Sequence, residues 1–387
     1  MKFPKGFIWG ASTAAHQVEG NNTNSDWWQI ENMPNSPVAE PSGAACDSYN
    51  RYAEDMQIVK DYGLNAYRFS FEWARIEPQQ GVFDDNEIDH YRQMITKCHE
   101  LGLEPIVTLH HFTFPAWFRA LGHWTHPDAA SIFANYCKKV APLLNDGVNW
   151  AITINEPNIH TMILAVQNGK EGRFFLPLPE QNVVDGIIKA HHAARKAIAE
   201  VSAVRTGWSI ANLNFYGVDG ASPEKVNEVS WAAEDQFIAE SKSDDFIGVQ
   251  CYSRTPVDNI GTAPLPEGSR ATDMRYEFFP PAIGLAIRHV AAALPNTPIL
   301  ITENGLGTAI DEERVEYING AMQAVEDAVA NGYDIRGYCH WSLLDNFEWA
   351  EGYRLKFGLV EVDRTTFKRT PKPSFSVYQS FVERLSS

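Results

Sequence analysis

The sequence contains few cysteines, and no two of them lie close together. The five are at positions 46, 98, 137, 251 and 339 of 387 residues, which suits neither a disulfide framework nor a thiolate metal site. Long apolar runs are also missing, since nowhere do about 18 apolar residues follow one another as in a membrane-spanning helix. The first residues, MKFPKGFIWG, lack the apolar core of a signal peptide. We therefore expect a cytoplasmic protein without a membrane span.

Basic residues are outnumbered, because Lys and Arg total 32 against 49 Asp and Glu, a net charge of −17. Such a charge repels nucleic-acid phosphates and anionic membrane surfaces, so neither is an expected partner. Low-complexity linkers are absent, and we expect residues 1–387 to form a single domain. Aromatic residues, by contrast, make up 12% of the chain. Their flat faces stack on sugar rings as well as fill cores, so a neutral small-molecule ligand fits this composition.

Short runs rich in β-branched and aromatic residues alternate with amphipathic segments along the whole chain. Helix-like patterns occupy 50–62, 127–145, 183–201, 223–241 and 311–331, and Gly63, Gly102 and Gly332 stand where helices should end. This alternation predicts an α/β fold, a single (β/α)8 TIM barrel. An open doubly wound sheet is the alternative, but no glycine-rich phosphate loop follows the first run. Eight runs are interpreted as strands: 6–12, 65–73, 104–112, 150–156, 206–215, 245–253, 298–304 and 335–343.

The predicted fourth and seventh strands end in carboxylates. Glu156 lies in TINEP and Glu303 in ITENG, and in a barrel both would project over the mouth where catalytic residues lie. Cleavage of a glycosidic bond needs two such carboxylates, one to protonate the leaving oxygen and one to attack or assist at the anomeric carbon. Asn155 is placed to bond a substrate hydroxyl, and Arg68 and Tyr252 to keep Glu303 ionised. The alternative, a glutamate that caps a helix or pairs with a lysine, suits a lone residue better than this pair.

Other barrel chemistries find less support in the sequence. A Schiff-base aldolase needs a lysine at a strand end, and none of the eight runs ends in one. His110 and His111 are adjacent on a predicted strand, so their side chains point to opposite faces and do not easily share a metal. His191 and His192 diverge on a predicted helix. No metal site is therefore expected.

Eight longer motifs occur from one end of the chain to the other. They are FIWGASTAAHQVEG, YRFSFEWARIEP, TLHHFTFPAW, TINEPN, DFIGVQCY, ITENG, GYCHWSLLDNFEWAEGYRLKFGLVEVD and KRTPKPSF. With these motifs the chain resembles glycoside hydrolase family 1, the β-glucosidase family. The resemblance implies a (β/α)8 barrel that hydrolyses small-molecule β-glycosides or oligosaccharides with retention of configuration and without a cofactor.

The resemblance also implies roles for individual residues. Glu156 corresponds to the acid/base and Glu303 to the nucleophile, and Arg68 and Tyr252 match positions that orient the nucleophile. The Trp341–Ser342 peptide corresponds to one that is cis in relatives. The residues that match sugar-binding positions of the deep subsite are Gln17, His111, Asn155, Trp341, Glu348 and Trp349, with Phe357 on the pocket wall.

Several segments depart from the family pattern. Segments 170–182 and 254–280 are short for loops over the mouth, so we expect an open entrance. The preferred sugar, the leaving group and the oligomeric state are left open. Three alternatives on the same site are also left open: a transglycosylating enzyme, an enzyme specific for disaccharide glycosides, and a catalytically silent sugar-binding barrel. The substituted positions are Gln250-Cys251-Tyr252 for Asn-Tyr-Tyr, His111-Phe112-Thr113-Phe114-Pro115 for His-Trp-Asp-Leu-Pro, His16 for Tyr, and Cys339-His340 for bulkier apolar residues.

Overall fold

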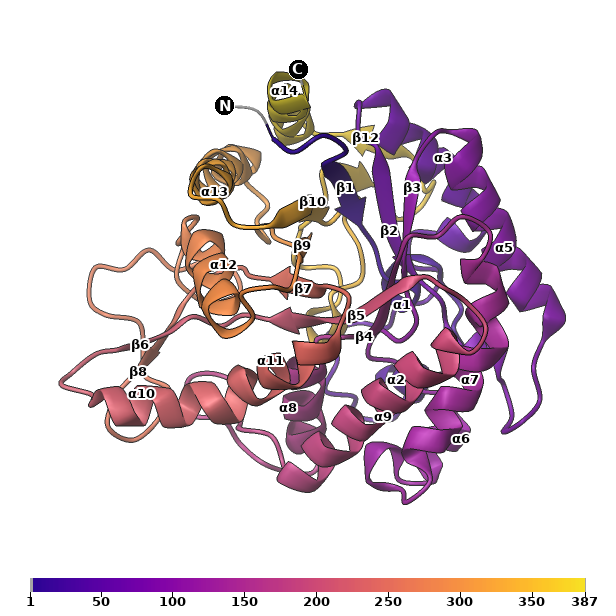
Figure 1. The fold of residues 1–387 in the computed structure, drawn as a ribbon, viewed down its shortest axis with the longest axis horizontal. Helices are drawn as coiled ribbons and strands as arrows, with labels where there is room; N and C mark the ends of the chain where they lie inside the picture. The colour runs from indigo at the N-terminus through magenta and orange to yellow at the C-terminus, as the bar shows by residue number, and fades with distance from the viewer. Residues whose placement is uncertain (1–2, 387) are drawn as a thin grey trace.

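Eight parallel strands form a closed barrel in the computed structural model, which describes residues 3–386 (Figure 1). The order around the barrel is β1-β10-β9-β7-β5-β4-β3-β2, and closure places Ile8 opposite Gly337 and Ser12 opposite Trp341. The predicted TIM barrel is thus confirmed, since an open sheet would leave two unpaired edges. The strands are β1 (Ile8–Ser12), β2 (Ala66–Ser70), β3 (Glu104–Thr108), β4 (Trp150–Asn155), β5 (Arg205–Ala211), β7 (Ile247–Gln250), β9 (Ile299–Glu303) and β10 (Ile335–Trp341).

Helices surround the barrel on its outer side (Figure 1). The longer ones are α3 (Ser48–Asp61), α5 (Asp85–Glu100), α7 (Ala129–Leu144), α9 (Gln181–Ala199), α12 (Ala282–Ala293), α13 (Asp311–Ala330) and α14 (Pro373–Ser386). Shorter helices are α1 (Ala15–Val18), α2 (Asp26–Glu31), α4 (Trp73–Ile76), α6 (Ala116–Ala120), α8 (Pro157–Gln167), α10 (Pro223–Ser230) and α11 (Gln236–Glu240). The remaining elements are η1 (His123–Thr125), η2 (Trp231–Asp235), η3 (Ser241–Ser243), η4 (Trp349–Glu351), the paired strands β6 (Phe215–Gly217) and β8 (Thr255–Val257), and the pair β11 (Val360–Val362) and β12 (Arg369–Pro371).

Local sequence explains where α5 begins and ends. The Asp84 side chain accepts a hydrogen bond from the Asn86 amide at 2.9 Å and so caps the first turn. Acidic side chains in this turn also interact favourably with the positive end of the helix dipole. After the last turn, Gly102 takes a φ of 68° that only glycine adopts without strain. Gly63 and Gly332 likewise have positive φ, as the sequence predicts.

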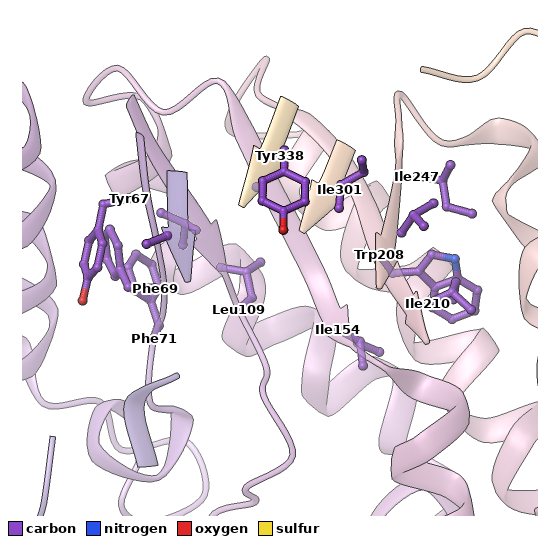
Figure 2. Close-up of a cluster of buried hydrophobic side chains, with 14 of the residues drawn as sticks. Tyr67, Phe69, Phe71, Leu109, Ile154, Trp208, Ile210, Ile247, Ile301 and Tyr338 are labelled. Atoms are coloured by element: carbon purple, nitrogen blue, oxygen red, sulfur yellow. The ribbon is translucent and has the colours of Figure 1, made fainter. Parts of the chain in front are cut away.

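Strand side chains alternate between the barrel interior and the helical layer. On β2 and just beyond it, Tyr67, Phe69 and Phe71 point outward and are at most 2% exposed (Figure 2). Arg68, between Tyr67 and Phe69, points inward and donates to Glu303 on β9. Figure 2 shows further outward-facing side chains, including Leu109 and Trp208, in the same layer. A separate apolar cluster fills the interior, contributed by Ile8, Ala66, Ile106, Trp150, Ile152, Phe246, Leu300 and Cys339. The barrel is therefore a packed core that supports polar groups at one end.

Two predicted elements differ from the structure in their course. The predicted strand 206–215 ends at Ala211 because Asn214 adopts a left-handed φ of 47°, and the chain resumes as β6. The predicted helix 223–241 is interrupted by the π-helical turn η2. There the Gln236 side chain donates to the Ala232 carbonyl at 2.7 Å, so a side chain intrudes into the helical hydrogen bonding. Helices α8, α12 and α14 were not identified from the sequence, and for α5 only the end before Gly102 was predicted.

All five cysteines are buried and unpaired, which agrees with the expected absence of a disulfide framework. Within residues 3–386, no helix combines the length and apolar character needed to cross a bilayer. The segments after α8 and β8 contact each other, since Arg173 donates to the Asp258 carboxylate at 2.5 Å and to the Thr262 carbonyl at 3.2 Å.

Candidate active site

The carboxyl ends of four barrel strands bring polar side chains together. Arg68 lies on β2, while Asn155, Gln250 and Glu303 are the last residues of β4, β7 and β9. All four are at most 3% exposed. Because parallel strands end at one edge of the barrel, residues distant in sequence meet in a single buried polar cluster.

Three side chains donate hydrogen bonds to the Glu303 carboxylate. Its Oε1 accepts from Arg68 Nη1 at 2.6 Å and from Gln250 Nε2 at 2.9 Å, and its Oε2 accepts from the Tyr252 hydroxyl at 2.5 Å. Burial raises the pKa of Glu303, but the Arg68 charge and these hydrogen bonds oppose that effect. The donors therefore favour the ionised form and fix the plane of the carboxylate.

Glu156 has the opposite environment. Pro157 begins α8 directly after it, and Glu156 takes a left-handed φ of 41° at this strand-to-helix junction. Glu156 is only 8% exposed, and its side chain makes no hydrogen bond within the described part of the chain. Burial and the nearby negative charge of Glu303 raise the pKa of Glu156 well above its usual value. The two environments therefore favour the proton on Glu156 over Glu303.

The side-chain amide of Asn155 has a defined orientation. Its Oδ1 accepts hydrogen bonds from Arg68 Nη2 at 2.5 Å and Gln250 Nε2 at 2.8 Å. Its Nδ2 lies 3.3 Å from Nε2 of His111. Because both donors occupy the oxygen, the amide presents its N–H groups toward His111 and the side where a ligand would lie.

Aromatic rings form one wall next to this cluster. His111 lies nearly parallel to Trp341, with ring centroids 5.8 Å apart at 12°, and to Trp349, at 6.2 Å and 10°. Trp341 packs with Phe357, which meets the Tyr252 ring edge-on at 5.9 Å. The Trp341–Ser342 peptide is cis, as the resemblance implies. Flat apolar faces beside oriented polar groups are suited to binding a sugar ring.

Gln17 and Glu348 form a second polar pair beside the aromatic wall. Gln17 Nε2 donates to Glu348 Oε2 at 3.3 Å and to the Phe347 carbonyl at 2.8 Å. Gln17 Oε1 is buried and has no hydrogen-bond partner in the structure. Burial and the charge of Glu303 raise the pKa of Glu348 to about 8. These groups can each exchange hydrogen bonds with a ligand hydroxyl.

The structure thus brings every candidate site residue of the sequence to one end of the barrel, and it adds three that were missed. Gln250 was noted only as a departure from the family pattern, although it precedes Tyr252 by two residues. Met274 packs against the cluster of Trp341 and Phe357. Burial and the Glu348 charge raise the pKa of Tyr276. Both of the latter lie in a hairpin closed by a bridge between residues 271 and 277, and no local sequence signal places it at the site.

One cluster within residues 3–386 has ligand atoms spaced as in a metal site, and it lies outside the catalytic cluster. It consists of Glu234, Asp235 and His289. Its buried member, Glu234, accepts a hydrogen bond from the Leu213 amide at 2.5 Å and so holds the segment after β5. This contact gives Glu234 a structural role in the connection to β6.

Comparisons with known proteins agree with this geometry. A family model described as Glycosyl hydrolase family 1 matches residues 1–206 and 228–386. The chain is 31% identical to a beta-glucosidase of Agrobacterium sp. over 437 residues, covering 98% of this chain and 95% of the relative. The crystal structure of beta-glycosidase BGL167 has a TM-score of 0.92 and 38% identity, covering 100% of this chain and 98% of that one. A family 1 beta-glucosidase from Thermotoga maritima has a TM-score of 0.90 and 28% identity, covering 100% and 99%.

Proposed function

Because the chain belongs to glycosyl hydrolase family 1, it is a retaining β-glycosidase, and we propose that Glu303 is its nucleophile and Glu156 its general acid/base. The observation that carries these roles is the contrast between the two carboxyl groups. Glu303 receives three hydrogen bonds, one of them from a buried guanidinium. Glu156 is buried without a donor beside the charge of Glu303.

The same contrast explains both steps of the reaction. In the first step Glu303 attacks the anomeric carbon, and the protonated Glu156 gives its proton to the leaving oxygen. Formation of the glycosyl ester removes the negative charge of Glu303, which is one cause of the raised pKa of Glu156. The pKa of Glu156 therefore falls in the intermediate, and its carboxylate takes a proton from the water that releases the sugar.

We propose that Gln17, His111, Asn155 and Glu348 bind the hydroxyl groups of the sugar. The rings of Trp341, Trp349 and Phe357 would form the walls of this subsite. A sugar without a phosphate fits best, because the nearby Arg354 already pairs with Glu351 at 2.5 Å. A solved relative from Thermotoga maritima is a complex with the sugar mimic deoxynojirimycin, and named relatives are beta-glucosidases. A β-glucoside is therefore the proposed substrate.

We further propose that residues 1–387 act as one catalytic domain, because the barrel uses strands from Ile8 to Trp341 and the site uses residues from Gln17 to Phe357. The five buried thiols fit the proposed cytoplasmic location. The short loops 170–182 and 254–280 favour an entrance open to large leaving groups.

A panel of nitrophenyl β-glycosides tests the proposed function. Wild type should hydrolyse the glucoside best among the glucoside, galactoside, fucoside and xyloside. Glu303→Ala should lose nearly all turnover while remaining folded by circular dichroism. Glu234→Ala is the matched control, since Glu234 is equally buried but lies outside the site, and it should retain turnover. Full activity of Glu303→Ala would overturn the assignment of the nucleophile.

A further inference from the structure

Gln250 uses both hydrogens of its side-chain amide within the catalytic cluster. Its Nε2 donates to Glu303 Oε1 at 2.9 Å and to Asn155 Oδ1 at 2.8 Å. A primary amide has only two N–H bonds, so this nitrogen is saturated. The side chain is fully buried, and its other end, Oε1, has no hydrogen-bond partner in the structure.

The orientation of the Gln250 amide follows from its neighbours. Asn155 Oδ1 already accepts a hydrogen bond from Arg68, and Glu303 Oε1 is a carboxylate oxygen that also accepts from Arg68. A rotated Gln250 would place its carbonyl oxygen against two other oxygens. The amide therefore acts as a donor here, although this leaves its own oxygen buried and unpaired. A buried oxygen without a partner costs stability, so the two acceptors on Asn155 and Glu303, and not the amide oxygen, determine the orientation of the amide.

Through these two hydrogen bonds Gln250 connects the nucleophile with a group that faces the sugar. Asn155 can present its N–H groups to a ligand only while its oxygen is held by Arg68 and Gln250. We propose that Gln250 is a positioning residue of the glycosidase reaction, which fixes the Glu303 carboxylate and the Asn155 amide relative to each other. This inference rests on the proposed role of Glu303.

The length of the side chain matters for this role. The family pattern has asparagine at this position, one methylene shorter than Gln250. In this chain the longer side chain spans from β7 to groups on both β4 and β9. Both contacts are made by this longer side chain.

The pKa of Glu303 distinguishes a positioning role of Gln250 from a purely structural one, because a purely structural role would leave this pKa unchanged. Without the Gln250 hydrogen bond, the ionised form of Glu303 loses a donor, so its pKa rises. The nucleophile must be ionised to attack, and the acidic limb of kcat/KM should then move to higher pH. The charged and titratable groups around Glu303 stay in place in such a variant: Arg68, Glu156, Tyr252, Cys339 and Glu348.

Gln250→Met is the test, because methionine has a similar shape and no donor. We expect kcat/KM for nitrophenyl β-glucoside to fall about 10- to 100-fold, as for loss of a hydrogen bond to a charged group. The fall should be larger in kcat than in KM, with the acidic limb at higher pH. Gln236→Met is the matched control, since Gln236 is a buried amide that also donates to a carbonyl but lies on α11. It should leave the pH profile unchanged.

Unchanged kcat/KM and an unchanged acidic limb in Gln250→Met would overturn the inference, as would a loss of activity without any movement of the limb. If Gln250→Met does not fold, Gln250→Leu decides, because leucine also lacks a donor and adds no charge; an unmoved acidic limb in that variant overturns the inference. A 2-deoxy-2-fluoro-glucoside with a dinitrophenolate leaving group separates this result from the proposed function. It should label Glu303 in wild type, and a label on another residue would refute the nucleophile assignment whatever Gln250→Met shows.

Discussion

Replacing Arg68 with methionine should affect catalysis and stability together, with a dependence on pH that identifies the cause. Arg68 is fully buried and donates four hydrogen bonds, to Glu303, Asn155, Thr108 Oγ1 at 3.1 Å and the Thr302 carbonyl at 3.2 Å. It is the cation of a buried ion pair with Glu303 at 2.6 Å. Arg68→Met therefore leaves a buried carboxylate without its compensating charge.

The expected size of the effect follows from that burial. Two unit charges about 4 Å apart attract by about 4 kcal/mol at an effective dielectric constant of about 20. Removing one partner of a buried pair costs about 3–5 kcal/mol of stability, and losing one preorganised donor lowers kcat about 10²- to 10³-fold. At low pH Glu303 is protonated in both proteins and the pair is absent. The loss of stability should therefore be small at low pH and grow as pH rises through the ionisation of Glu303.

Urea unfolding at several pH values and pH profiles of kcat/KM measure both effects. Arg369→Met is the matched control, because Arg369 forms an equally buried pair with Asp55 at 2.8 Å, away from the site. It should lose stability without a shift of the acidic limb of kcat/KM, whereas Arg68→Met should shift that limb to higher pH. Two results for Arg68→Met would refute the role of Arg68. One is a kcat/KM within about threefold of wild type, against the loss expected for a missing donor, and the other is an unmoved acidic limb.

Three further variants probe the surroundings of the nucleophile. Tyr252→Phe removes the 2.5 Å hydrogen bond to Glu303 Oε2, so kcat/KM should fall about 10- to 100-fold and its acidic limb should move to higher pH; an unmoved limb contradicts this. Glu348→Gln should raise KM. Because the pKa of Glu348 is raised to about 8, the wild type loses stability as pH rises toward 8, and Glu348→Gln should become more stable relative to it in urea unfolding. A difference in unfolding free energy that stays constant with pH argues against this. Gly305→Ala would place Cβ 1.8 Å from the Trp341 carbonyl oxygen and should cost about 2–3 kcal/mol in urea unfolding; wild-type stability would refute that clash.

The sequence predicts the catalytic carboxylates well because their position depends on few interactions. Glu303 ends β9 and Glu156 directly follows the last residue of β4. The end of each strand is visible in the sequence as a local pattern, followed by Pro157 in one case and by Asn304 in the other. The barrel topology then determines that both lie at the same mouth. A similar local signal, glycine after an amphipathic run, correctly predicts the end of α5.

The sequence does not predict features that depend on contacts across the barrel. The hydrogen bonds of Gln250 reach residues 95 and 53 positions away, so the sequence alone shows only an unusual amino acid. The strand predicted to continue to residue 215 ends earlier. Beyond its end, the Leu213 amide donates a hydrogen bond to the Glu234 side chain, which lies in the distant helical turn η2. Tyr276 comes to the site through a hairpin in which Met274 packs against the cluster of Trp341 and Phe357, residues far away in the sequence.

The anomeric configuration of the glycosyl azide formed by two variants tests the assignment of both carboxylates most directly. In Glu156→Ala, Glu303 still forms the glycosyl ester from an activated aryl β-glucoside, and azide then displaces it to give the β-glycosyl azide. In Glu303→Ala, azide replaces the missing nucleophile on the opposite face and gives the α-glycosyl azide, with Glu156 as the acid. Proton NMR of the products distinguishes the two anomers. A β-azide from Glu156→Ala together with an α-azide from Glu303→Ala is the predicted result, and the reverse pairing would contradict the roles of Glu156 and Glu303.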